Sequence, residues 1–132
     1  MQKIPKVLIV EDEKPMAHAL ELKLTKAGFE PTIAENGQIA LDLLQSGHYD
    51  LLLLDIIMPI MNGFSVLEYL KKESKIKMPI IMTTNLGQDE DCKKALELGA
   101  TDYIVKSNTP IAQIVDRIKE ILGKNNSGKK KS

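Results

Sequence analysis

Five residues of this chain could do chemistry together, and each lies at or just after the end of a short apolar run: Glu11, Asp12, Asp55, Thr84 and Lys106. If the runs are neighbouring parallel strands, these side chains meet at the carboxyl edge of a sheet, where ligands bind in open α/β proteins. Carboxylates that face an amine and a hydroxyl form a site for a divalent cation and a phosphoryl group. The residue types therefore predict metal-dependent phosphate chemistry.

The three acids need a positive partner, because carboxylates within a few ångströms of one another oppose each other's ionisation. Mg²⁺ or Mn²⁺ would supply that charge and prefers oxygen ligands. A zinc site is disfavoured, because His18 and His48 lie away from the ends of the runs and the chain has one cysteine. Asp55 follows the most apolar run and is the predicted nucleophile, which would carry phosphate as an acyl phosphate. Lys106 and a threonine hydroxyl would bind the phosphoryl oxygens.

Each of these residues also has a purely structural interpretation. An aspartate after a strand is usually a turn former or a helix cap, and a lysine in the same place is usually solvated. Taken alone, each residue fits the structural interpretation better. The joint occurrence of all five, in this order and on this pattern, favours the functional one.

The elements that would position these residues follow from hydrophobic periodicity. Apolar runs alternate with segments whose apolar residues recur every three or four positions, which predicts β-then-α units. Five such units favour an α/β fold of the flavodoxin-like kind, a three-layer sandwich with a parallel five-stranded sheet of order 2-1-3-4-5. Strands 1 and 3 are adjacent in that order, so the three acids would share one crevice. The predicted strands are 6–10, 31–34, 51–54, 79–83 and 102–105.

Cap residues indicate where the predicted helices begin and end. Asparagines precede the second and third helices, and asparagine is a favoured N-cap. Glycines follow the first, second and fourth helices, and glycine commonly ends a helix. The fourth helix is expected at 88–98 and the last at 111–122, where the apolar periodicity is clearest. The cap residues are Asn36, Asn62, Gly28, Gly47 and Gly99.

Length and charge limit the classes of function. A chain of 132 residues forms one domain, which we place at residues 1–122, with 123–132 as a disordered basic tail or linker. The tail holds four lysines and no acid, so the domain itself is acidic, which argues against direct nucleic acid binding. No apolar run is long enough for a membrane span, and no signal peptide precedes the first strand. With Cys92 as the single cysteine, these features predict a cytoplasmic protein.

Several stretches together resemble the receiver domain of two-component response regulators, the CheY-like family. The resemblance covers residues 5–122. Its D-x-x-M-P-x-M-x-G pattern, combined with an acidic pair upstream and a lysine downstream, is highly specific. It implies the flavodoxin-like fold and a role as a phosphorelay switch. The matching stretches are Val7–Glu13 (VLIVEDE), Asp55–Gly63 (DIIMPIMNG), Thr84 and Tyr103–Lys106 (YIVK).

The resemblance assigns roles to individual residues. Asp55 would be the phosphoacceptor, Lys106 would bind the phosphoryl group, and Thr84 would be the switch hydroxyl. Tyr103 would be the aromatic residue whose ring turns inward on phosphorylation, and a ring that simply packs on the fourth helix is the alternative. The implied ligands of Mg²⁺ are Glu11, Asp12, Asp55 and the backbone carbonyl of Ile57.

The same resemblance implies partners. A sensor histidine kinase or a phosphotransfer protein would donate the phosphoryl group from a phospho-histidine. The receiver would catalyse only its own phosphorylation and dephosphorylation, with no independent substrate. Phosphorylation would switch the surface of helix 4, strand 5 and helix 5 and so control an output partner. We expect a monomer, and Asp102 with Arg117 on that surface would suit a phosphorylation-dependent dimer or a local ion pair.

Four positions depart from the usual pattern of this family. Ser107 stands where a proline usually follows the lysine, and Asn85 stands where a small residue usually follows the threonine. The Asn85 amide would crowd the phosphoryl group or hydrogen-bond to it. Ile57 and Leu86 are apolar at positions that flank the path of hydrolytic water. Because apolar groups cannot orient that water, the sequence predicts slow hydrolysis of the aspartyl phosphate.

An unphosphorylated receiver-like interaction module is the alternative function, although such modules commonly lose an acidic site residue. A haloacid-dehalogenase-type phosphatase needs a D-x-D motif after the first strand, and residues 11–13 (EDE) lack its nucleophile. A flavodoxin-like flavin carrier needs a Ser/Thr-rich phosphate loop there, and the acids of residues 11–15 would repel the phosphate. These last two classes are set aside.

Overall fold

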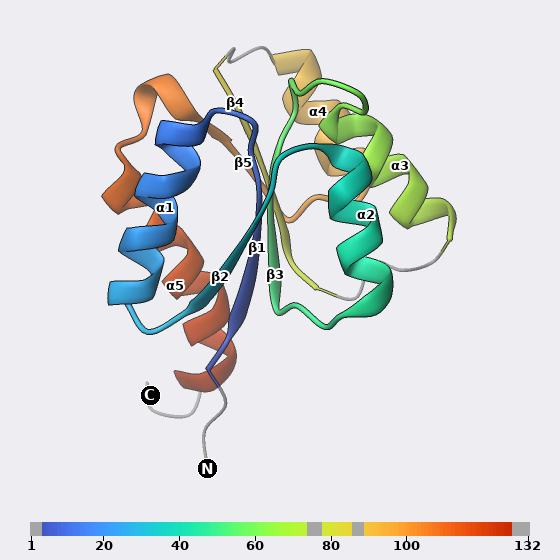
Figure 1. Cartoon of the computed structure of the whole chain (residues 1–132). Helices are drawn as coiled ribbons and strands as arrows, with labels where there is room; N and C mark the ends of the chain where they lie inside the picture. Colours follow the sequence, from blue (N-terminus) through green and yellow to red (C-terminus); the bar gives the residue numbers. More distant parts are fainter. Residues whose placement is uncertain (1–3, 74–77, 86–88, 128–132) are drawn as a thin grey trace.

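The chain folds into a parallel β-sheet between two layers of helices (Figure 1). The computed structural model describes residues 4–73, 78–85 and 89–127. Its elements are β1 (Lys6–Val10), α1 (Lys14–Lys26), β2 (Glu30–Ala34), α2 (Gly37–Ser46), β3 (Leu51–Asp55), α3 (Gly63–Lys72), β4 (Ile80–Thr84), α4 (Asp89–Glu97), β5 (Asp102–Val105), the 3-10 helix η1 (Lys106–Asn108) and α5 (Ile111–Ser127). The strand order is β2-β1-β3-β4-β5, which confirms the predicted fold class and topology.

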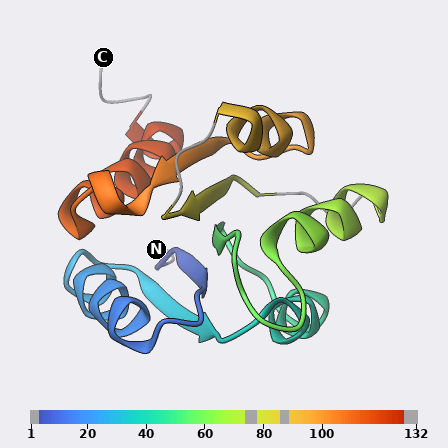
Figure 2. The ribbon, with the colours of Figure 1, turned by 90° about the horizontal axis from the view of Figure 1, so that it is seen from above.

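Helices cover both faces of this sheet. α1 and α5 lie on one face, and α2, α3 and α4 lie on the other (Figure 1). The view from above in Figure 2 separates the same two layers on either side of the strands. This arrangement follows from right-handed crossovers between parallel strands, which place successive helices on the faces of the sheet.

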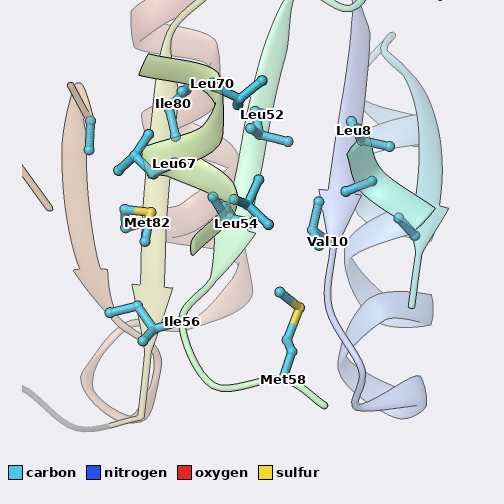
Figure 3. Close-up of a cluster of buried hydrophobic side chains, with 14 of the residues drawn as sticks. Leu8, Val10, Leu52, Leu54, Ile56, Met58, Leu67, Leu70, Ile80 and Met82 are labelled. Atoms are coloured by element: carbon cyan, nitrogen blue, oxygen red, sulfur yellow. The ribbon is translucent and has the colours of Figure 1, made fainter. Parts of the chain in front are cut away.

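Each face of the sheet carries its own apolar core, because side chains alternate between the two faces along every strand. In β3, Leu52 and Leu54 belong to the core that packs against α2 and α3 (Figure 3). Leu51 and Leu53 belong to the core that packs against α1 and α5. All four are at most 2% exposed, as a central strand covered on both faces requires. The backbone of Asp55, the last residue of this strand, is therefore held rigidly by the packed strand.

The pairing register brings the ends of the strands to one edge of the sheet. Val10 pairs with Leu54 between β1 and β3, and Thr84 pairs with Val105 between β4 and β5. The residue that follows each strand therefore emerges at the same edge. Lys106, directly after β5, reaches that edge together with the acids that follow β1 and end β3.

The predicted caps define the helix boundaries. The side chains of Asn36 and Asn62 each accept a hydrogen bond of 2.9 Å from the backbone N–H three residues on, at the start of α2 and α3. Gly28 and Gly99 follow α1 and α4 in the left-handed region, with φ of 97° and 110°. Glycine adopts this conformation without steric cost, which explains why the two helices end there. Gly47 ends α2 in an extended conformation.

Helix α5 continues to Ser127, beyond Leu122, where the sequence placed the end of the domain. Apolar periodicity marks only the part of a helix that packs on a core, so it gives no signal for the last turn. Residues 128–132 of the predicted tail lie outside the described residues, and the division at Leu122 stays a prediction. Neither α5 nor any other helix within the described residues is long and apolar enough to cross a membrane.

Candidate functional site

Three acidic side chains meet at the carboxyl edge of the sheet. Glu11 and Asp12 follow β1, and Asp55 ends the neighbouring strand β3. One carboxylate oxygen from each residue lies within 4.8 Å of the other two. Glu11 and Asp55 are 3% and 4% exposed, so water screens their repulsion poorly. The acidic cluster that the sequence predicts is therefore present, and its oxygens are close enough to share one small cation.

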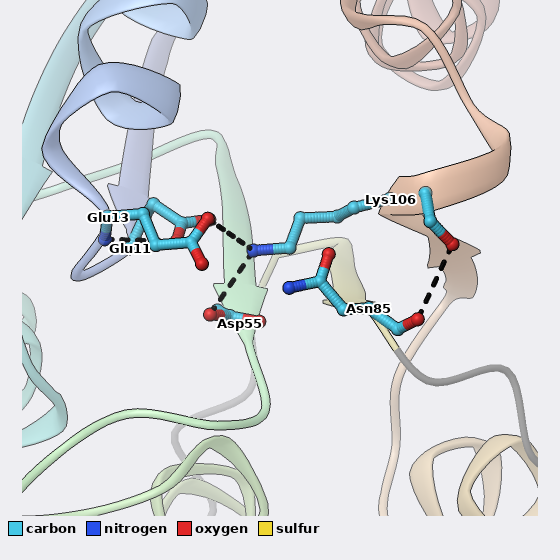
Figure 4. Close-up of polar contacts among 6 residues, drawn as sticks. Glu11, Glu13, Asp55, Asn85 and Lys106 are labelled. Atoms are coloured by element: carbon cyan, nitrogen blue, oxygen red, sulfur yellow. Dashed lines mark hydrogen bonds and ion pairs between the residues drawn. The ribbon is translucent and has the colours of Figure 1, made fainter.

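Lys106 supplies a positive charge to this cluster. It begins η1, directly after β5, and its side chain reaches across the edge of the sheet toward β1 and β3 (Figure 4). Its Nζ donates a hydrogen bond to Glu11 Oε1 at 2.9 Å and lies 3.4 Å from Asp55 Oδ2. The Lys106 side chain is 5% exposed. A buried lysine held in this way offsets part of the charge of the acids and could later contact an anionic group bound to Asp55.

The electrostatics of the site set the ionisation of its central residues. The pKa of the Asp55 carboxyl is raised to about 7, first by burial and next by the charge of Glu11, while Lys106 acts in the opposite direction. Burial by itself would lower the pKa of Lys106, but its hydrogen bond to Glu11 and the charge of Asp55 raise the pKa above its ordinary value. Lys106 is therefore charged at neutral pH. A cation beside Asp55 would favour the ionised, nucleophilic carboxylate.

The loop after Asp55 folds back tightly beneath the end of the strand. The Gly63 N–H donates a hydrogen bond of 2.8 Å to the Ile56 carbonyl. Ile60 lies in the left-handed region, at a φ of 69°, which is disfavoured for a β-branched residue. Ile57 is 57% exposed on this loop. The loop is thus held in a strained path beside the acids, and the ligand role of the Ile57 carbonyl stays a prediction.

The two predicted switch residues lie on β4 and β5. Thr84 ends β4 and is 1% exposed. Tyr103, in β5, is partly buried and packs against the apolar core on the α4 side of the sheet. The pKa of its hydroxyl is raised first by burial and then by the charges of Asp91 and Cys92, which both lie on α4. Packing beside α4 is therefore what the structure shows for Tyr103, and a ring movement on phosphorylation stays a prediction.

Two of the four unusual positions are joined in the structure. Ser107 Oγ donates a hydrogen bond of 3.4 Å to the Asn85 carbonyl, which ties the end of β4 to η1. The Asn85 side chain points toward the gap between Asp55 and Lys106 (Figure 4). No cis peptide bond occurs among residues 4–73, 78–85 and 89–127, where the usual family pattern has one after the lysine. Leu86 lies outside the described residues.

Glu13 also lies at the site, although its sequence position predicts no role for it. Its Oε1 lies 3.9 Å from Lys106 Nζ, and its backbone N–H donates to Glu11 Oε2 at 3.2 Å. The available signal was its position directly after the acidic pair. That signal is weak, because an exposed glutamate before a helix is usually solvated.

Asp102 and Arg117 form an ion pair between β5 and α5 within one chain. The Arg117 side chain is about half exposed and also lies 3.5 Å from Glu120. The local ion pair, one of the two alternatives for these residues, is thus present. A phosphorylation-dependent dimer through them stays a prediction.

Comparison with known proteins finds response regulators, by the sequence profile and by individual relatives alike. The sequence profile described as "Response regulator receiver domain" matches residues 7–119. The transcriptional regulatory protein CusR of Escherichia coli is 43% identical over 117 residues, which cover 89% of this chain and 51% of CusR. The probable transcriptional regulatory protein SilR of Salmonella typhimurium is 38% identical over 122 residues, which cover 92% of this chain and 53% of SilR.

Solved structures of similar shape are receiver domains as well. The receiver domain of Francisella response regulator 1452 superposes with a TM-score of 0.84 at 29% identity, covering 92% of this chain and 98% of that one. TrrA of Thermotoga maritima, solved in complex with Mg²⁺ and BeF, gives a TM-score of 0.78 at 31% identity, covering 89% and 99%. The chain spans about half the length of the curated relatives CusR and SilR. It belongs to the response regulator receiver domain family of two-component systems.

Proposed function

We propose that Asp55 of this receiver accepts a phosphoryl group from a phospho-histidine donor, with Mg²⁺ or Mn²⁺ bound beside it. The observation that carries the proposal is the placement of Asp55. It ends a fully buried strand, lies within 3.4 Å of the Lys106 ammonium, and shares a cluster with Glu11 and Asp12. Asp55 is thus a nucleophile with both a positive side chain and a candidate cation site beside it.

The acidic cluster fits the proposed cation by its donor chemistry. All three side chains offer carboxylate oxygens, which are the ligands that Mg²⁺ and Mn²⁺ prefer. The backbone carbonyl of Ile57 would add a fourth oxygen. The Mg²⁺ in the related TrrA structure supports the same choice of cation here. When bound, the cation would offset the repulsion between the Asp55 carboxylate and an incoming phosphoryl group.

The proposed transfer forms one bond and breaks another. A carboxylate oxygen of Asp55 attacks phosphorus and forms an O–P bond, while the N–P bond of the phospho-histidine breaks. The imidazole nitrogen keeps the electron pair of that bond and takes up a proton. Lys106 would stabilise the charge on the transferred oxygens. In the later hydrolysis, a water oxygen attacks phosphorus and Asp55 leaves as a carboxylate.

The proposed output is a change of the surface formed by α4, β5 and α5. Thr84 ends the strand next to β3, so its hydroxyl would donate to a phosphoryl oxygen on Asp55. Tyr103 lies in β5 beside α4 and would respond to that movement. The acyl phosphate would thus shift a two-state surface rather than act on a substrate.

The partners follow from the family. A sensor histidine kinase or a phosphotransfer protein would supply the phosphoryl group, and an output domain or protein would read the switched surface. CusR and SilR are named as transcriptional regulators. The prediction that the protein does not bind nucleic acid is therefore not supported by these relatives, and rests only on the acidic charge of the receiver. We propose the cytoplasm as the location, because the donor kinases act there. No observation favours the unphosphorylated interaction module.

Intact-mass spectrometry tests the proposal directly. The protein is incubated with acetyl phosphate and Mg²⁺ beside the variant Asp55→Ala. We expect a gain of about 80 Da that hydroxylamine removes, as for an acyl phosphate, and that Asp55→Ala does not show. An equal gain in the variant, or no gain from both acetyl phosphate and a phospho-histidine donor, would overturn the proposal.

A further inference from the structure

Glu13 directly precedes α1, but its side chain does not cap the helix. It occupies the N-cap position, where an acceptor side chain usually bonds to a backbone N–H of the first turn, yet it makes no side-chain capping hydrogen bond. Its side chain turns toward the site instead, with Oε1 3.9 Å from Lys106 Nζ (Figure 4). The start of the helix therefore does not explain where this carboxylate lies.

Among the ion-pair partners of Lys106 within the described residues, Glu13 differs from the other two. Glu11 and Asp55 belong to the acidic cluster that can hold a cation, whereas Glu13 does not. The Glu13 side chain is 54% exposed, while those of Glu11 and Asp55 are at most 5% exposed. A cation that draws on the oxygens of Glu11 and Asp55 weakens their attraction for Lys106. Glu13 then keeps its full charge for the lysine.

We propose that Glu13 is a positioning residue for Lys106, which keeps the Lys106 ammonium over Asp55 once a divalent cation occupies the acidic cluster. This inference rests on the proposed phosphoryl transfer to Asp55. An ammonium that is already in place stabilises the arriving phosphoryl oxygens without reorganisation. Because Glu13 lies at the exposed rim of the site, it can hold the lysine without adding a ligand to the cation.

The variant Glu13→Gln tests this role, because it removes the charge and keeps the size and the backbone contact to Glu11. The first measurement is ¹⁵N NMR of the Lys106 side-chain ammonium with Mg²⁺ present. We expect a lower order parameter and faster exchange of the ammonium protons in the variant. The second is the rate of phosphorylation by acetyl phosphate at saturating Mg²⁺. We expect a fall of about two- to fivefold, the size typical of a half-exposed ion pair.

Glu35→Gln is the matched control. Glu35 is an exposed acid just after β2, at the same edge of the sheet. Among the described residues, the ion-pair partners of Lys106 are Glu11, Glu13 and Asp55. The control removes an equal charge and should leave the order of Lys106 unchanged. If Glu13→Gln leaves that order unchanged, or if both variants slow phosphorylation equally, the positioning role is wrong.

The two measurements separate the inference from the proposed function. If the wild-type protein gains no phosphoryl group, the proposed function fails, and the NMR comparison still decides whether Glu13 holds Lys106. If phosphorylation proceeds on Asp55 and the order of Lys106 does not depend on Glu13, only the inference fails. Glu13→Asp, whose carboxylate is one methylene shorter, should give an intermediate order of Lys106.

Discussion

A Cβ atom on Gly63 would lie 2.4 Å from the backbone carbonyl oxygen of Asp55. The carbonyl belongs to the backbone, and the position of a Cβ is fixed by the backbone that carries it, so rotation of a side chain cannot relieve the contact. The first turn of α3 therefore packs directly against the backbone of Asp55, the residue that we propose as the phosphoacceptor. The glycine at the end of the D-x-x-M-P-x-M-x-G pattern is required by this close approach and not by a left-handed backbone.

Gly63→Ala should lower the free energy of unfolding by about 2–4 kcal/mol, because the strand end and the helix start must move apart. The shift should also slow phosphorylation, since it displaces Asp55. Urea denaturation measures the loss of stability, and the acetyl phosphate reaction measures the rate of phosphorylation.

Gly123→Ala is the control, because a Cβ there meets nothing within 4 Å. This variant should be neutral or more stable than the wild type by up to about 1 kcal/mol. Equal losses in both variants would contradict the steric account.

The raised pKa of Asp55 makes the stability of the cation-free protein depend on pH. Its ordinary value is 3.8 and its value in the folded chain is about 7, so the folded state binds the proton more tightly than the unfolded state. The contribution of this group to stability is complete below about pH 4 and is lost as the pH rises through 7. We expect a loss on the order of 2 kcal/mol between pH 5 and pH 8.

Chemical denaturation at several pH values, without divalent cations, measures this loss. Asp55→Asn should remove most of the pH dependence and should be more stable than the wild type at pH 8. Saturating Mg²⁺ should restore stability to the wild type at pH 8 and not to the variant. Asp42→Asn, at an exposed carboxylate on α2, should keep the wild-type dependence. A flat profile in the wild type would show that Asp55 is ionised across this range.

Lys106→Met should destabilise the cation-free protein, because Glu11 and Asp55 then lie buried without their positive partner. Breaking a buried ion pair in this way costs about 3 kcal/mol. Thermal unfolding with and without Mg²⁺ measures the effect, and Mg²⁺ should recover part of the loss because it binds the same acids. Lys119→Met, at an exposed position on α5, should change stability by less than about 0.5 kcal/mol. A larger loss with Mg²⁺ than without it would contradict this assignment of charges.

The sequence predicts those parts of the fold and site that depend on local pattern. The all-apolar run that ends at Asp55 indicates a strand buried on both faces, and parallel pairing then forces its carboxylate to the edge where Glu11 and Asp12 emerge. Asn36 and Asn62 act as caps through bonds to residues three positions on. Such contacts are short in sequence, or follow from one topology, so composition and spacing reveal them.

The remaining features depend on contacts that no local pattern encodes. Glu13 follows β1 and Lys106 follows β5, so the two residues are far apart in sequence. Only the assembled sheet brings Glu13 Oε1 within 3.9 Å of Lys106 Nζ. The left-handed backbone of Ile60 also runs against the preference of its residue type. The sequence leaves two interpretations open for Tyr103, because an aromatic ring on a strand suits both a packing and a switching role.

Ile57→Asn should speed the loss of phosphate from Asp55. Ile57 is 57% exposed on the loop that follows the phosphoacceptor, and an apolar side chain there cannot orient the attacking water. A carboxamide in its place can hydrogen-bond to that water, and we expect a rate increase of about tenfold, below the range typical of full acid–base assistance. The decay of the phosphorylated mass after removal of acetyl phosphate measures the rate.

Ile60→Asn is the control, because Ile60 lies on the same loop and is 78% exposed. Its left-handed backbone also suits asparagine better than isoleucine, so this control should fold at least as well as the wild type and lose phosphate at the wild-type rate. Equal decay in the wild type and Ile57→Asn would show that the slow step does not depend on water placed by this position.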